Sequence, residues 1–88
     1  MEKCEFCERE KQLTFHHYIP KTLHNNKYFK KIFDKDYMRT YGVYLCKDCH
    51  KTLHKFFKNK ELAKNYNTKE KIFNSDKYMK FIKWIRKQ

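Results

Sequence analysis

The sequence predicts a small α+β fold, and three observations lead to this class. Two short segments rich in strand-forming residues, 13–19 and 41–45, are expected to pair as strands. Helical spacing of apolar residues takes over from Lys47 onward. The chain has 88 residues, so apolar burial alone leaves the fold marginally stable, and its four cysteines offer a staple.

The first predicted strand, residues 13–19, alternates apolar and polar side chains, which is typical of a strand with one buried face. Pro20 is expected to end it, because proline has no amide hydrogen to donate to a neighbouring strand. The second predicted strand, residues 41–45, begins beside Gly42, where we expect a bend or a bulge.

Helices are expected between and after the strands. The mixed pattern of residues 21–36 favours one short helix within a long loop. A longer helix is expected to begin near Lys47, and a short helical turn should follow over residues 61–63. The charged stretch from Glu8 to Gln12 is expected to lie in solvent.

The last helix is expected to begin at Ser75 or Asp76, and Thr68 is a predicted N-cap of the segment before it. Aromatic residues of the last helix can be interpreted as base-stacking groups, but their helical spacing favours packing in the core. The residues that we assign to the core are Tyr78, Phe81, Ile82, Trp84 and Ile85.

The charge balance favours an anionic partner. Lysine and arginine number 22 against 10 aspartates and glutamates, a formal net charge of +12 at pH 7. DNA, RNA and anionic lipid all attract such a chain. Lysines occur in every segment instead of lying opposite one continuous apolar face, so a membrane surface is the weakest of these and nucleic acid is expected.

The expected compartment is the cytoplasm. No run approaches the ~20 apolar residues of a membrane-spanning helix, and the first residues lack the pattern of a secretory signal. Thiols stay reduced in the cytoplasm, which favours metal binding over disulfides for the four cysteines.

The cysteines form two C-x2-C pairs, Cys4 with Cys7 and Cys46 with Cys49. This spacing lets two thiolates of each pair reach one tetrahedral Zn²⁺ ion. Four sulfur ligands leave no position for water, so the zinc would be structural. Buried free thiols or a redox pair are the alternative.

Four of the five histidines lie in the first strand or directly after the last cysteine. His50 and His54 are one helical turn apart and can hold one cation together, whereas a solvated helix face is the alternative. A regular strand points His16 and His17 to opposite faces, so both reach one site only if the strand bends, which the nearby Pro20 permits. His17 has the parity of apolar Phe15, so packing of His17 in the core is its alternative.

Three features together resemble the HNH endonuclease family, of the small stand-alone bacterial or phage type with a four-cysteine zinc site. They are the C-x2-C pair at 4–7, the run His16-His17-Tyr18-Ile19-Pro20, and the run 45–50 followed by His54. The resemblance covers residues 4–54. It implies a single HNH nuclease-like domain over 1–88, in which a zinc-stapled ββα-metal, treble-clef-like core (1–58) precedes a helical C-terminal extension (59–88).

The resemblance also implies roles for the histidines. His16, His50 and His54 would hold one divalent cation (Mg²⁺, Mn²⁺, Ni²⁺ or Zn²⁺), and His17 would be the general base. The implied activity is that of a metal-dependent DNA endonuclease or nickase, which hydrolyses phosphodiester bonds with low intrinsic sequence specificity.

One position departs from the family pattern. The middle asparagine of the HNH motif, which orients the base through a hydrogen bond to the backbone, would fall near Tyr41. Thr40 or a backbone carbonyl is expected to take its place. The departure supports two alternatives: a catalytically inactive zinc-stapled nucleic-acid-binding module, or an accessory partner of another nuclease.

The expected partner is DNA, bound through its phosphates in a salt-sensitive way, with targeting by a protein partner as a further expectation. A solvated loop is the alternative for the segment that is expected to contact the phosphates. Monomer and homodimer are both left open. The residues expected to contact DNA are Lys21, His24, Lys27, Lys30 and Lys31.

Overall fold

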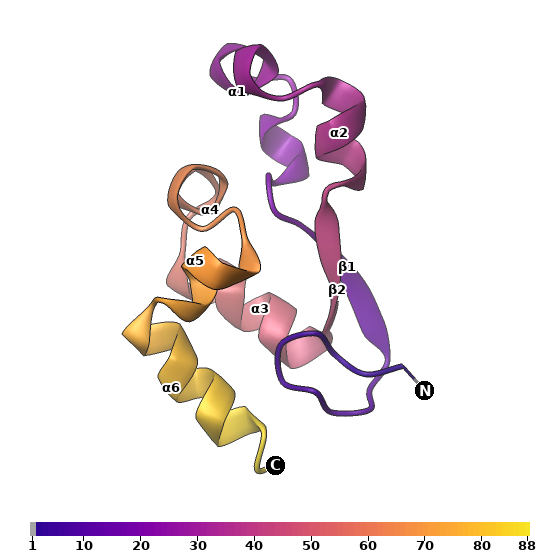
Figure 1. Ribbon diagram of the computed structural model, residues 1–88, viewed down its shortest axis with the longest axis vertical. Coiled ribbons are helices and arrows are strands. Elements are labelled where there is room, and N and C mark those ends of the chain that lie inside the picture. The colour runs from indigo at the N-terminus through magenta and orange to yellow at the C-terminus, as the bar shows by residue number, and fades with distance from the viewer. Residues whose placement is uncertain (1) are drawn as a thin grey trace.

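The structure, a computed structural model, describes residues 2–88 and is an α+β fold, as predicted (Figure 1). One antiparallel pair of strands is joined to several short helices. Along the chain the elements are β1 (Leu13–His17), the 3-10 helix η1 (Lys21–Leu23), α1 (Lys27–Ile32), α2 (Lys35–Thr40), β2 (Gly42–Cys46), α3 (Lys47–Phe56), α4 (Asn59–Asn65), α5 (Lys69–Phe73) and α6 (Asp76–Ile85).

The two strands pair in a continuous antiparallel register that runs from Leu13 opposite Cys46 to His17 opposite Gly42. β1 is two residues shorter than predicted, although the amide of Tyr18 still donates to the carbonyl of Tyr41 (3.2 Å). The register leaves no room for the predicted bulge at Gly42, and its φ is not positive. The lack of a side chain at Gly42 instead lets the backbones of β1 and β2 approach closely.

The connection between the strands holds three short helices, where the sequence predicted one. The 3-10 helix η1 follows Pro20 directly. Side chains cap the other two: Asn26 accepts from the amide of Tyr28 (2.9 Å), and Asp34 accepts from the amide of Asp36 (3.1 Å). Apolar side chains of all three helices form a small core of their own together with Ile19 and with Ala63 of α4.

The second half of the chain packs helices against α3 and the cysteines. Thr68 caps α5 and Ser75 caps α6, as predicted. Tyr78 and Ile82 are fully buried, but the assignment of Trp84 to the core is wrong, since it is 57% exposed. Trp84 is two residues beyond Ile82, a rotation of about 200° around the helix, so it faces away from the core.

No helix within residues 2–88 combines the length and the apolar character that crossing a membrane requires.

A methyl group at Gly42 should destabilise the hairpin. Its Cβ would overlap the carbonyl oxygen of His16 and would lie 2.5 Å from the ring of Phe15. We expect Gly42→Ala to lower the free energy of unfolding by about 1–3 kcal/mol, the usual cost of overpacking. Thermal unfolding followed by circular dichroism measures this, and a midpoint equal to that of the original chain would contradict the close approach.

Candidate metal centres

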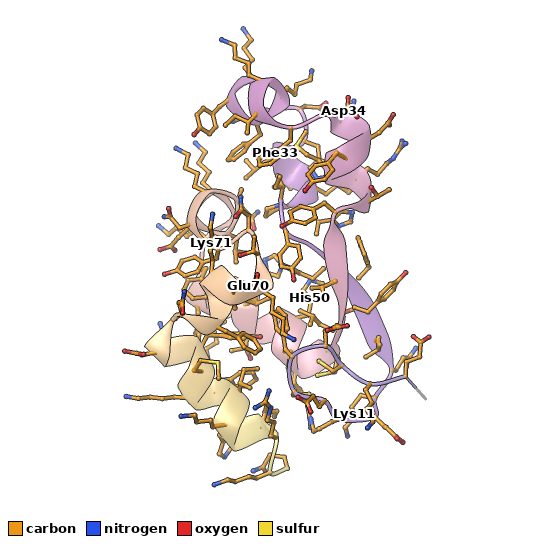
Figure 2. All side chains as sticks on the ribbon, viewed as in Figure 1. Lys11, Phe33, Asp34, His50, Glu70 and Lys71 are labelled. Carbon is orange, nitrogen blue, oxygen red and sulfur yellow. The ribbon has the colours of Figure 1, made fainter. Side chains whose placement is uncertain are left out.

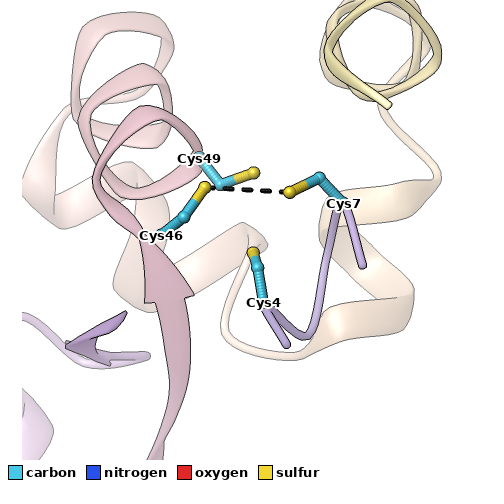
Figure 3. A group of neighbouring side chains, drawn as sticks. All are labelled: Cys4, Cys7, Cys46 and Cys49. Atoms are coloured by element: carbon cyan, nitrogen blue, oxygen red, sulfur yellow. Dashed lines mark hydrogen bonds between the residues drawn. The ribbon is translucent and has the colours of Figure 1, made fainter. Parts of the chain in front are cut away.

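The four cysteines meet in one buried cluster (Figure 3). Cys4 and Cys7 come from the loop before β1, Cys46 ends β2, and Cys49 lies in the first turn of α3. Each is at most 2% exposed, all four sulfur atoms lie within 4.8 Å of one another, and the Sγ atoms of Cys7 and Cys46 are 3.7 Å apart. All four thiols are free.

The cluster fits a tetrahedral metal ion. Zinc–sulfur bonds of about 2.3 Å in a tetrahedron place the sulfurs ~3.8 Å apart, close to the separation of Cys7 and Cys46. A disulfide needs ~2.05 Å. The neighbouring Cys49 thiol lowers the pKa of Cys4, so the cluster favours a thiolate even without an ion. The cluster can therefore hold a structural metal such as zinc, as the spacing predicted.

The loop that carries Cys4 and Cys7 is a tight turn. The amide of Glu8 donates to the carbonyl of Cys4 (2.9 Å), and the amide of Cys4 donates to the carbonyl of Arg9 (3.0 Å). Glu8 has a φ of 65°, the left-handed conformation that a non-glycine residue rarely adopts. The turn aims both thiols at the cluster.

Arg9 is a member of this site that the sequence did not reveal. Its Nε donates to Cys7 Sγ (3.3 Å), and its second terminal nitrogen donates to Cys46 Sγ (3.5 Å) and to the carboxylate of Asp48 (3.1 Å). Its side chain is 12% exposed, so Arg9 departs from the expectation that residues 8–12 lie in solvent, which the other four residues confirm. A guanidinium beside thiolates offsets the negative charge that four sulfur ligands gather.

Helix α6 supports the cluster from both sides. The hydroxyl of Tyr78 donates to the carbonyl of Cys49 (2.9 Å), and burial raises the pKa of Tyr78, which keeps this donor protonated. The guanidinium of Arg86 donates to the carbonyl of Phe6 between the first two cysteines (3.1 Å). The C-terminal residues are thus part of the structure that positions the thiols.

A second cluster brings together His16 of β1 with His50 and His54 of α3. One ring nitrogen of each lies within 4.8 Å of the others, and the ring centres are 5.1 to 5.5 Å apart. His16 is fully buried, His50 is partly buried, and His54 is exposed. The label in Figure 2 marks His50, where α3 passes beside the strands.

The environment of His16 fits a metal ligand. Both of its ring nitrogens are buried without a hydrogen-bond partner among the described residues, an arrangement that ordinarily costs about 1–3 kcal/mol. Burial, followed by repulsion from His50 and His54, lowers the pKa of His16 to about 3, so the ring stays neutral and keeps a lone pair for a cation. A divalent ion between the three rings would bind one of the two ring nitrogens of His16.

Thr14 orients His50, which the sequence also did not reveal. Its hydroxyl donates to the carbonyl of Leu45 (3.0 Å) and lies 2.8 Å from Nδ1 of His50. A hydroxyl has a single proton, so it must accept from Nδ1–H of His50 if both contacts are hydrogen bonds. This tautomer leaves the lone pair of His50 on Nε2, free to bind a cation.

His17 lies on the opposite face of β1 and is partly exposed, so packing in the core is not its role. Its ring lies edge-on to Phe15 at 4.8 Å and to His24 at 5.5 Å. Burial and the neighbouring His24 lower the pKa of His17, whereas the nearby backbone of Arg39 raises it.

Thr40 does not take the place of the missing asparagine. Its hydroxyl donates to the carbonyls of Asp36 (3.1 Å) and Tyr37 (3.3 Å) within its own helix. Tyr41, near which the HNH resemblance places that asparagine, donates its hydroxyl to the carbonyl of Asn67 (2.6 Å). Of the two expected substitutes, Thr40 is excluded and a backbone carbonyl stays a prediction.

The residues expected to contact DNA separate into two groups. Lys21 and His24 lie near His17, but His24 is buried and its Nε2–H donates to the carbonyl of Ile19 (2.7 Å), so it is not part of a solvated loop. Lys27, Lys30 and Lys31 are exposed on α1, at the end of the molecule farthest from α6 (Figure 1).

Comparison with known proteins gives one informative relative. Over 86 residues the chain is 35% identical to YisB of Bacillus subtilis (strain 168), and the match covers 97% of this chain and 74% of YisB. The chain belongs to the YisB family. YisB is described as an uncharacterized protein, so this membership assigns no activity. No family model matches the chain, and no solved structure matches it.

Removal of metal from this YisB-family protein should unfold it. Zinc binding to thiolate sites in small peptides is worth roughly 10–16 kcal/mol, which exceeds the stability expected of a core this small. We expect a strong chelator to abolish the helical circular dichroism signal, and Cys49→Ser to act alike. A chain that keeps its spectrum after metal analysis has shown complete removal would contradict a structural metal.

Loss of the Thr14 hydroxyl should weaken the histidine centre without unfolding the protein. Loss of an outer hydrogen bond of this kind typically costs 10–100-fold in metal affinity. We expect Thr14→Val to bind added Ni²⁺ about tenfold or more weakly, and Thr14→Ser to bind it normally. Calorimetric titration of protein that already carries zinc on its cysteines measures both variants. Equal affinity in Thr14→Val would contradict the orienting role.

Proposed function

We propose that this YisB-family protein is a metal-dependent DNA endonuclease or nickase of the HNH type. His16, His50 and His54 hold its divalent cation, and His17 is its general base. The observation that carries the proposal is the buried, unpartnered imidazole of His16 beside two histidines of α3. An imidazole without a partner in that position is costly, and a cation bound to one of its nitrogens would offset that cost.

The topology around the histidines supports the proposal. An antiparallel pair of strands leads without a loop into α3, so one ligand comes from β1 and two come from the helix. This order is the one expected of a ββα-metal core. The thiolate cluster at the start of α3 plays no chemical part, because four sulfur ligands would leave its metal closed to substrate.

The chemistry is hydrolysis of a phosphodiester bond. A divalent cation on the three imidazoles supplies Lewis-acid stabilisation of the negative charge that develops on the phosphate. His17 takes a proton from water as the water oxygen bonds to phosphorus, and the bond from phosphorus to the 3′ oxygen breaks. The departing oxygen is protonated from solvent. The backbone of Arg39, whose proximity raises the pKa of His17, is the group that would orient the ring for this transfer.

The surroundings of the histidine cluster suit a DNA strand. A cavity of about 270 Å³ opens over it, lined by Thr14, Lys47, His50, Lys51 and His54. Two lysines at its mouth can contact phosphates, and the net charge of +12 adds attraction that does not depend on sequence. We therefore propose low intrinsic specificity, with a protein partner as the source of any precise targeting.

Three imidazole ligands suit Zn²⁺, Ni²⁺, Mn²⁺ or Co²⁺ better than Mg²⁺, which prefers oxygen ligands. The cleavage experiment described below therefore compares Mg²⁺ with Mn²⁺, Ni²⁺ and Zn²⁺.

The alternative is a module that binds nucleic acid, or assists another nuclease, without cutting. Tyr41 favours it, since the residue at the asparagine position is engaged with Asn67 and not with His17. The two functions differ in one measurable property. A nuclease loses cleavage and keeps DNA affinity when its base is removed, whereas a binding module has no cleavage to lose.

Cleavage of supercoiled plasmid by the purified protein at low salt tests the proposal, with Mg²⁺, Mn²⁺, Ni²⁺ and Zn²⁺ added in turn. We expect His17→Ala to cut at least about 100-fold more slowly, because general base catalysis contributes 10²–10⁴-fold, and to bind DNA as well as the original chain. Lys80→Ala, an exposed change on α6, is the matched control. Full cleavage by His17→Ala would remove the assignment of the base, and a lack of cleavage with every ion would favour the binding module.

A further inference from the structure

A second cavity lies on the other side of β1 from the histidine cluster. It has a volume of about 240 Å³ and is lined by His17, Lys21, His24, Asn25, Lys35 and Arg39. Three of these residues carry a positive charge, and none of the described residues that line it is acidic. We call it the Lys35 cavity.

Three elements build the Lys35 cavity. Lys21 is the first residue of η1, while Lys35 and Arg39 lie one turn apart on α2 and so share a face of that helix. His17, at the end of β1, forms another part of the wall. The hydrogen bond from His24 to the carbonyl of Ile19 fixes the ring that lies 5.5 Å from His17.

The positive charges of the cavity are largely free for an outside partner. Within residues 2–88, neither Lys21 nor Lys35 forms an ion pair. Arg39 pairs with Asp36 at 2.8 Å, but both side chains are more than two-thirds exposed. An exposed pair of this kind contributes at most about 1 kcal/mol, so a phosphate can compete for the guanidinium.

We propose that the Lys35 cavity binds a phosphate of the DNA strand next to the phosphate that is cut. The inference rests on the proposed function, because it takes His17 as the base. His17 forms part of the cavity wall, so a DNA strand whose reacting phosphate lies beside His17 brings a neighbouring phosphate within reach of Lys21 and Lys35. Lysine, arginine and asparagine supply donors for phosphate oxygens there, and they read no base.

Two variants that each remove two lysines test the site. Lys21→Ala/Lys35→Ala empties the cavity of two charges, and Lys80→Ala/Lys83→Ala removes two from α6, at the opposite end of the molecule from α2 (Figure 1). All four lysines are exposed, so both variants should fold. Fluorescence anisotropy with a short DNA duplex over a range of salt measures affinity and its salt dependence.

We expect the cavity variant to bind DNA at least about tenfold more weakly, and its salt slope to fall by ~0.9, the value for one phosphate contact. The control variant should lose less than twofold. A second readout is the nuclear magnetic resonance signal of the His17 ring during titration with inorganic phosphate. It should shift in the original chain and stay fixed in the cavity variant.

Three results would overturn the proposal: a loss of DNA affinity in the control variant equal to that in the cavity variant, a cavity variant that binds DNA as tightly as the original chain, or a His17 signal that does not shift with phosphate. Phosphate binding combined with full DNA affinity would reassign the cavity to another anion, such as an acidic protein partner. Neither readout requires cleavage. If the plasmid stays intact while both readouts come out as expected, the nuclease function fails and the DNA phosphate site stands.

Discussion

The four-cysteine cluster is the constraint on which the rest of the structure depends. It joins Cys7 to Cys46 across 39 positions and fixes the point at which β2 passes into α3. Helix α6 and its C-cap then contact both halves of the cluster, because Tyr78 donates to the carbonyl of Cys49 and Arg86 donates to the carbonyl of Phe6. The histidines of α3 and β1 can meet only because this junction holds the helix beside the hairpin.

Two adjacent residues of β1 lie in the two different environments that the proposed chemistry requires. His16 lies in a buried setting that disfavours a proton and suits a metal ligand, and its neighbour His17 lies in a partly open one that admits water. Alternation of side chains along a strand achieves this with adjacent residues. The lysines are less localised, and nitrogen-tipped side chains project around the outline of the molecule (Figure 2).

Much of the fold could be predicted from the sequence. A strand within 13–19, the caps Thr68 and Ser75, and the paired C-x2-C spacings depend on local rules, and the structure bears them out. The apolar residues of this strand did not mark its buried face, since His16 is fully buried and Phe15 only partly. Arg9 and Thr14 were missed because their partners lie 37 and 36 positions away, at Cys46 and His50. Trp84 was misassigned because the spacing of apolar residues does not show how far the buried face extends around the helix. Contacts set by tertiary structure leave no periodic trace.

The register of the hairpin limits how the length of this chain can vary. Because side chains alternate, a shift of one residue between β1 and β2 would bring His17 to the helix and turn His16 away from it. Gly42 opposite His17 and the bond from Thr14 to Leu45 oppose such a shift. We expect relatives of different length to carry their insertions between η1 and α2, where the chain turns at the surface, and to leave residues 13–17 intact.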